Sequence, residues 1–127
     1  MQANPKPTIL IADDNALMRE LLASVLREAG IYDVLRAANG IEVIEIYREK
    51  RPDIVFLDIQ MPDPDGLATL SKIRELNAKA FVVMVSGYSS AENVKTAIDT
   101  GAKGFIVKPF SVNRVMGIIN KYQAEAS

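Results

Sequence analysis

Residues 8–14 read TILIADD, an apolar run of strand length that ends in two adjacent carboxylates. Similar apolar runs recur along the chain and alternate with segments of helical periodicity, five of each. This alternation is typical of repeated strand–helix–strand units around a parallel sheet, so we predict an α/β fold. The expected strands are residues 8–12, 32–37, 54–57, 81–85 and 104–107.

The segments between these runs repeat apolar residues at the spacing of amphipathic helices. The first helix is expected over about residues 16–29, with Gly30 as the left-handed residue that closes it. Ser89 and Glu92 have the spacing of a capping box that would open the fourth helix, which Gly101 would end. The expected buried faces include Leu17, Leu21, Leu22, Val25 and Leu26 in the first helix, and Val94, Ala97 and Ile98 in the fourth.

The composition fits one domain without cross-links. A chain of 127 residues with 49% hydrophobic content can bury its own core. We expect a single domain over residues 1–127, with a flexible N-terminal segment at 1–7 and a short polar tail at 124–127. Cysteine and histidine are absent. Disulfides, thiolate metal sites and imidazole chemistry are therefore excluded.

The charge and hydropathy patterns exclude two further classes of partner. The net charge of −1 shows no basic excess of the kind that direct nucleic-acid binding requires. No apolar run approaches the roughly 20 residues of a membrane-spanning helix, so we expect no membrane insertion. The N-terminal segment lacks the apolar stretch of a signal peptide, and we expect a cytoplasmic location.

Four charged residues follow the ends of three expected strands. Asp13 and Asp14 follow the first strand, Asp58 follows the third, and Lys108 follows the fifth. In open parallel sheets, these ends border the crevice where ligands bind. If the strands lie side by side, the four charges converge.

Three gathered carboxylates would need a cation. Two like charges 4 Å apart repel by about 4 kcal/mol at an effective dielectric of 20. Mg²⁺ prefers oxygen ligands and commonly lies between one or two carboxylates and a phosphate. A carboxylate beside it can take a phosphoryl group, and Asp58 is the candidate nucleophile. The alternative for Asp13 and Asp14, taken alone, is that each caps the following helix.

Two further residues suit a phosphoryl site. Lys108 would pair with the incoming phosphoryl oxygens, and the hydroxyl of Ser86, after the fourth strand, would donate to another. Catalysis there would consist mostly of positioning and charge neutralisation. The alternatives are a solvated lysine and an ordinary serine at a strand end.

Together these residues resemble a response-regulator receiver domain, similar to the single-domain chemotaxis regulators, over essentially the whole chain from Ile9 to Tyr122. The matching positions are Asp13-Asp14, Leu57-Asp58, Met61-Pro62, Asp65-Gly66, Ser86, Phe105 and Lys108-Pro109-Phe110. The resemblance implies a flavodoxin-like (βα)5 three-layer sandwich, with a five-stranded parallel sheet of order 2-1-3-4-5. It also implies two-component signalling, in which a histidine kinase or histidine phosphotransfer protein phosphorylates Asp58.

The resemblance assigns further roles around the site. It implies that Mg²⁺ is bound by Asp14, Asp58 and the backbone carbonyl of Gln60, with Asp13 acting partly through water. It also implies a cis peptide bond between Lys108 and Pro109. Two positions that vary in the family control the approach of water to the acyl phosphate. Here they are Gln60 and Tyr88, and we expect the bulky Tyr88 side chain to shield the phosphoryl group partly.

The switch implied by the resemblance consists of Ser86 and Phe105. Ser86 would move toward the phosphoryl group, and Phe105 would turn inward and reshape the surface of the fourth helix, fifth strand and fifth helix. That surface would serve a downstream protein target or a linked output domain, or a phosphorylation-dependent dimer. The alternative makes Phe105 an ordinary core aromatic, since the tyrosine hydroxyl common at this position is missing.

Three other functions fit this sequence less well. A haloacid-dehalogenase-like phosphatase needs a second acid two residues after its nucleophile, where Gln60 stands. A flavodoxin needs a phosphate loop after the first strand, where Asp13 and Asp14 would repel the cofactor. An inactive receiver would serve only as an interaction domain, although every acidic residue and Lys108 are present. We expect a phosphorylatable switch and not a turnover enzyme.

Overall fold

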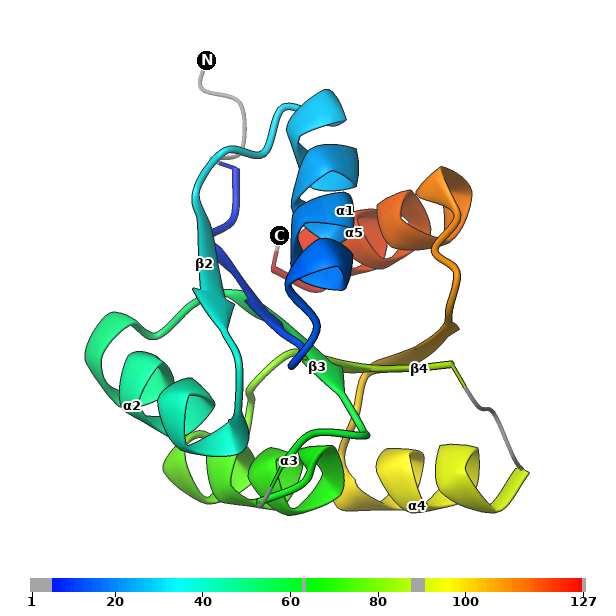
Figure 1. Ribbon diagram of the computed structural model, residues 1–127. Helices are drawn as coiled ribbons and strands as arrows, with labels where there is room; N and C mark the ends of the chain where they lie inside the picture. The colour runs from blue at the N-terminus through cyan, green and yellow to red at the C-terminus, as the bar shows by residue number, and fades with distance from the viewer. Residues whose placement is uncertain (1–5, 63, 88–90, 127) are drawn as a thin grey trace.

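The computed structural model describes residues 6–62, 64–87 and 91–126. Within these residues, strands and helices alternate (Figure 1). The strands are β1 (Ile9–Ala12), β2 (Val34–Ala37), β3 (Ile54–Asp58), β4 (Val82–Ser86) and β5 (Gly104–Val107). The helices are α1 (Ala16–Glu28), α2 (Gly40–Lys50), α3 (Gly66–Leu76), α4 (Ala91–Thr100) and α5 (Val112–Ala126).

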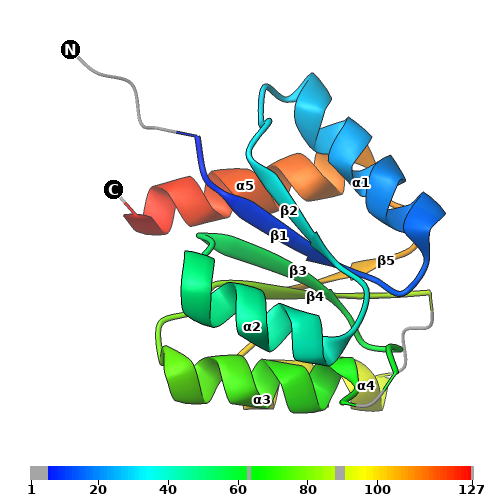
Figure 2. The ribbon, with the colours of Figure 1, turned by 60° about the vertical axis from the view of Figure 1, so that its left-hand side comes forward.

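The strands form one parallel sheet in the order β2-β1-β3-β4-β5, which confirms the predicted flavodoxin-like topology (Figure 2). The second strand begins at Val34, two residues later than expected. β3 and β4 extend one residue further than expected, to Asp58 and Ser86. These two polar residues are therefore the last residues of buried strands.

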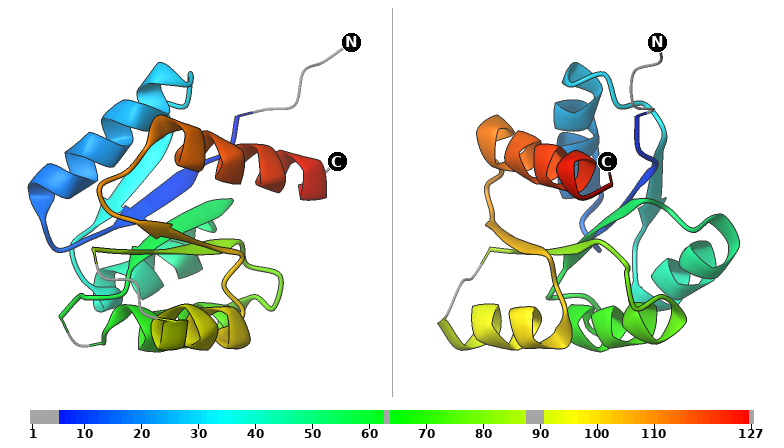
Figure 3. Two further views of the ribbon diagram at one scale, coloured as in Figure 1. Left: turned by 90° about the vertical axis from the view of Figure 1, so that its right-hand side faces the viewer. Right: turned by 180° about the vertical axis from the view of Figure 1, so that it is seen from behind.

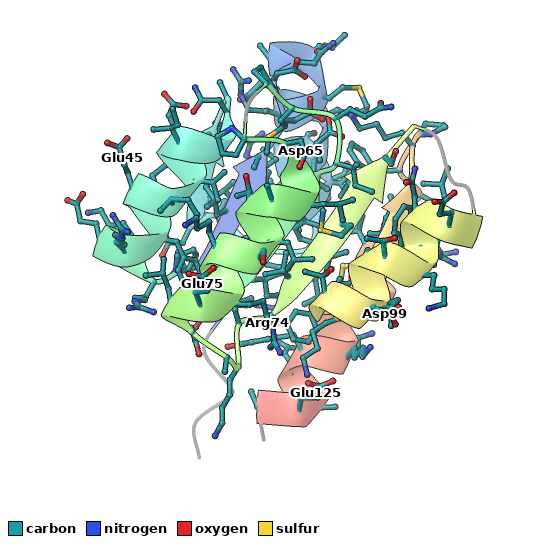
Figure 4. The ribbon with its side chains drawn as sticks, turned by 90° about the horizontal axis from the view of Figure 1, so that it is seen from below. Glu45, Asp65, Arg74, Glu75, Asp99 and Glu125 are labelled. Atoms are coloured by element: carbon teal, nitrogen blue, oxygen red, sulfur yellow. The ribbon has the colours of Figure 1, made fainter. Side chains whose placement is uncertain are left out.

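The sheet lies between two layers of helices, as the three-layer prediction requires. Helices α1 and α5 cover one face, and α2, α3 and α4 cover the other (Figures 1 and 3). Figure 4 shows the second layer from outside, with Asp65 at the start of α3 and Glu75 near its end. Each layer closes over its own apolar cluster. Leu22, Leu26, Val115 and Ile119 belong to the first, and Val43, Leu70, Ile73 and Ala97 to the second.

Burial explains the character of the strand sequences. All residues of β1, β3 and β4 are buried, because helices cover both faces of these central strands. β2, at the edge of the sheet, is only partly buried and carries a mixed sequence, as predicted. The functional candidates Asp58 and Ser86 therefore end two of the three strands that are buried throughout.

Part of the predicted helix packing is wrong. Leu22 and Leu26 are buried, but 75% of Leu17 is exposed and Leu21 is also exposed. On α4, Ala97 is buried, whereas Ile98 is 49% exposed. The apolar stripe of a helix is wider than the strip that the sheet covers, so residues at the margin and in the first turn remain in solvent.

The helix ends follow the expected chemistry where they are described. Gly30 has a φ value of +85°, the left-handed conformation predicted for it, and Gly101, with a φ value of +112°, follows the end of α4 as predicted. Ser89 of the predicted capping box lies outside the described residues. So does most of the 1–7 segment. The segment expected as a polar tail at 124–127 belongs to α5 as far as Ala126. In the described chain, no helix has the length and apolar character to cross a membrane.

Candidate phosphoryl and metal site

The three predicted acidic residues converge at the carboxyl end of the sheet. One carboxylate oxygen from each of Asp13, Asp14 and Asp58 lies within 4.8 Å of the others. Asp13 and Asp58 are buried, with 3% and 4% of their surfaces exposed, and Asp14 is exposed. β1 and β3 are direct neighbours in register, and this pairing brings residues 45 positions apart together.

Lys108 completes the cluster. Its Nζ atom lies 2.7 Å from Oδ2 of Asp13 and 3.2 Å from Oδ2 of Asp58. The Lys108 backbone amide also donates to the carbonyl of Ser86 over 2.8 Å, so the end of β4 fixes the start of the loop after β5. The peptide bond between Lys108 and Pro109 is cis, the isomer that the resemblance implies.

Backbone amides hold the other oxygens of the two buried acids. The amide of Gln60 donates to Oδ1 of Asp58 over 3.0 Å, and the amide of Asn15 donates to Oδ1 of Asp13 over 2.9 Å. Each acid therefore presents one oxygen to its own loop and the other to Lys108. Such charge-assisted bonds fix the orientation of both carboxylates.

Asn15, and neither Asp13 nor Asp14, caps α1. Its side-chain oxygen accepts a hydrogen bond from the Met18 amide over 3.2 Å. The capping alternative for the two acids is therefore wrong. The sequence could have identified Asn15 as the cap, because asparagine directly before a segment of helical periodicity is a favoured N-cap residue.

The backbone of Gly66 lies so close to the end of β3 that only glycine fits there. The Gly66 amide donates to the Ile59 carbonyl over 2.9 Å. A Cβ atom on Gly66 would lie 2.1 Å from the carbonyl oxygen of Asp58 and 2.5 Å from the Ile59 Cα. This close approach holds the start of α3 against the end of β3.

The electrostatics of the cluster favour one more cation. Burial raises the pKa of the Asp58 carboxyl; the Gln60 amide and Lys108 oppose this rise, and Asp13 adds to it. Burial also lowers the pKa of Lys108, but its contacts with Asp13 and Asp58 outweigh that effect and raise it. Lys108 thus stays charged, yet it does not fully compensate the acids. Three gathered oxygens with this excess negative charge fit Mg²⁺.

The structure describes three of the four remaining predicted site residues. Ser86 is fully buried at the end of β4, one strand away from Asp58. Phe105, on β5, is partly buried and packs against the cluster beneath α2, α3 and α4. Gln60 is exposed beside Asp58. Tyr88 lies outside the described residues.

Some contacts around the site have no clear signal in the sequence. Arg19 donates from Nη1 to the carbonyl of Asp13 over 2.7 Å. Gly40 opens α2 where a Cβ atom would lie 2.4 Å from the hydroxyl oxygen of Thr69 and 2.6 Å from the carbonyl of Pro64. The loop between β3 and α3 is therefore packed closely against the start of α2.

Comparison with known proteins agrees with this geometry. Residues 9–120 match the model of the response regulator receiver domain family. The chain is 43% identical over 113 residues to the chemotaxis protein CheY of Bacillus subtilis, which covers 89% of this chain and 94% of that protein. It is 40% identical to CheY of Thermotoga maritima, with the same coverage of both chains.

Solved structures agree as well. The CheX–CheY–BeF₃–Mg²⁺ complex of Borrelia burgdorferi contains a chain that superposes with a TM-score of 0.85 at 35% identity, over 89% of this chain and 86% of that one. A receiver domain protein of the CheY type from Methanospirillum hungatei superposes with a TM-score of 0.81 at 27% identity, over 92% and 96%. These comparisons do not favour the phosphatase alternative.

Proposed function

Because the chain belongs to the response regulator receiver family and acts in two-component phosphoryl-accepting signal transduction, we propose that Asp58 is its phosphoacceptor. The observation that carries this proposal is the position of Asp58 at the end of β3. There it is buried, bonded to Lys108 and within reach of two further carboxylates. The donor is a histidine kinase or a histidine phosphotransfer protein, since this chain has no histidine of its own.

In the proposed reaction, a carboxylate oxygen of Asp58 forms a bond to phosphorus while the bond from phosphorus to the donor imidazole nitrogen breaks. The nitrogen keeps the electron pair of that bond. Lys108 pairs with the phosphoryl oxygens, and Ser86 donates its hydroxyl to one of them. The Gln60 amide, 3.0 Å from Oδ1, keeps the Asp58 carboxylate in one orientation during the transfer.

The acidic cluster is the proposed Mg²⁺ site. Asp14, Asp58 and the Gln60 backbone carbonyl would hold the ion, with Asp13 acting partly through water. When bound, Mg²⁺ supplies the positive charge that phosphoryl transfer needs on the transferring oxygens. The CheY complex from Borrelia burgdorferi, which contains BeF₃ and Mg²⁺, supports this assignment for a similar chain.

The proposed partner-binding surface is formed by α4, β5 and α5. No turnover of an outside substrate is proposed. Each of these elements carries an exposed apolar side chain, respectively Ile98, Val107 and Val112. Ser86 and Phe105 are the proposed link between the phosphoryl group and this surface. A downstream protein or a linked output domain would bind there, and a dimer of phosphorylated chains is the alternative occupant. The cytoplasmic location stays a prediction.

Intact-mass measurement tests the phosphoacceptor. Wild type incubated with phosphoramidate and Mg²⁺ should gain one phosphoryl group, and Asp58→Ala should gain none. Equal gain by both proteins would reject Asp58 as the phosphoacceptor.

Tyr88→Ala should shorten the lifetime of the phosphorylated state, because water would reach the acyl phosphate more easily. An unchanged lifetime would remove the shielding role.

A further inference from the structure

Arg19 lies about one turn into α1 and reaches back to the loop that carries Asp13 and Asp14, the blue turn after β1 in Figure 2. Its Nη1 atom donates to the Asp13 carbonyl over 2.7 Å, and the side chain is partly buried. The pairing of β1 with its neighbouring strands ends at Ala12. Among the described residues, no backbone amide donates to the Asp13 carbonyl, so Arg19 supplies its donor.

This bond constrains the next residue. The carbonyl of Asp13 and the amide of Asp14 share one rigid peptide plane, so fixing the carbonyl fixes the plane from which Asp14 extends. Asp13 has further anchors, because the Ala37 carbonyl accepts from its amide and Lys108 bonds its carboxylate. The exposed carboxylate of Asp14 has no hydrogen bond within the described part of the chain. Its direction depends on the backbone.

Arg19 also carries a positive charge, and within the described residues no carboxylate forms an ion pair with it. Its charge and its hydrogen bond act on a bound cation in opposite directions. A guanidinium near the acids repels Mg²⁺, so its removal should tighten binding if charge alone mattered. If the hydrogen bond sets the direction of Asp14, its removal should weaken binding instead.

We propose that Arg19 is a positioning residue for Mg²⁺: it holds the Asp13–Asp14 peptide so that the Asp14 carboxylate faces the cluster. This inference rests on the proposed function, in which the cluster binds Mg²⁺. The effect of Arg19 passes through a metal ligand, and groups that orient metal ligands typically contribute 10- to 100-fold to metal affinity. Loss of the single bond from Arg19 to the Asp13 carbonyl should lower the Mg²⁺ affinity by an amount at the lower end of this range, about tenfold.

Titration of the unphosphorylated proteins with MgCl₂, followed by backbone NMR shifts, tests this role. Arg19→Met keeps the length of the side chain but removes its donors and charge, and it should bind Mg²⁺ about tenfold more weakly than wild type. Arg19→Lys keeps the charge and places its donors on one flexible ammonium group, and its affinity should fall between those of wild type and Arg19→Met. Arg27→Gln removes a positive charge from the exposed end of the same helix and should leave the affinity within about twofold of wild type.

Unfolding of each variant in EDTA separates this role from a structural one, because a structural contact would lower stability without changing the Mg²⁺ affinity of the folded protein. Equal or tighter Mg²⁺ binding by folded Arg19→Met would overturn the inference while leaving the proposed function intact. If that variant does not fold, wild-type affinity in Arg19→Lys would overturn it. Absence of Mg²⁺ binding by wild type would overturn both the metal site and this inference.

Discussion

Nζ of Lys108 lies 3.2 Å from Oδ2 of Asp58, although the two residues are 50 positions apart in the chain. Both side chains are largely buried, with 17% and 5% exposure. The contact exists because β3 and β5 both end at the carboxyl end of the sheet, with only β4 between them. Besides its proposed role toward the phosphoryl group, this charged pair should influence the stability of the unphosphorylated protein.

Lys108→Met should destabilise the metal-free protein by about 3 kcal/mol, because it leaves two buried carboxylates without their counter-charge. Urea unfolding in EDTA measures this change. Lys95→Met is the matched control, since Lys95 pairs with Asp99 on the exposed surface of α4, and its loss should cost about 0.5 kcal/mol or less. Similar losses for both variants would show that the buried acids do not depend on Lys108.

Asp58→Asn should stabilise the metal-free protein at neutral pH. Burial raises the pKa of Asp58, so the folded state favours the protonated carboxyl. Its contribution to stability is fully present below the ordinary pKa of 3.8 and is lost as the pH rises through the raised folded value. Above that window the wild type has a charged, buried carboxylate, and the variant does not.

The measurement is urea unfolding of both proteins in EDTA across this pH range. The stability advantage of Asp58→Asn should shrink as the pH falls from above the raised folded pKa toward 3.8, and it should level off below 3.8, where the carboxyl is protonated in both states. If the variant is less stable than wild type at neutral pH, the expected stabilisation by Asp58→Asn is contradicted.

Gly66→Ala should lower stability by about 2 kcal/mol, because its Cβ atom would overlap the Asp58 carbonyl and force the backbone to move. The same movement would shift Gln60 and weaken Mg²⁺ binding. Gly117→Ala on α5 is the control, since nothing lies within 4 Å of its added Cβ atom, and it should stabilise by about 0.5–1 kcal/mol. A neutral Gly66→Ala would mean that the loop adapts without cost.

Beryllofluoride with Mg²⁺ should change the backbone NMR shifts of residues near Asp58. It should also change those of Ile98, Val107 and Val112 on the proposed binding surface of α4, β5 and α5. The physical reason is that a phosphoryl mimic can act at a distance only by biasing an element with two arrangements, here Ser86 and Phe105. Asp58→Asn, treated in the same way, should show neither set of changes. Shifts confined to the surroundings of Asp58 would eliminate the switch.

The sequence was sufficient to predict the fold and the acidic cluster for one reason. Central strands of a parallel sheet are covered on both sides, so they appear as apolar runs whose ends are easily located. The exposure of Leu17 was not predictable, because periodicity defines a stripe on a helix but not how far the sheet extends beneath it. Asn15 could have been identified as the cap. The role of Arg19 could not have been identified, because an arginine in the first turn of a helix looks the same in the sequence whether it bonds to a preceding carbonyl or points into solvent.

The most direct test identifies the residue that carries the phosphoryl group. Wild type phosphorylated with phosphoramidate and Mg²⁺ is reduced with borohydride, which converts an aspartyl phosphate to homoserine, and its peptides are sequenced by mass spectrometry. The account predicts homoserine at position 58 and aspartate at positions 13 and 14. Homoserine at position 13 or 14, with aspartate retained at 58, would contradict it.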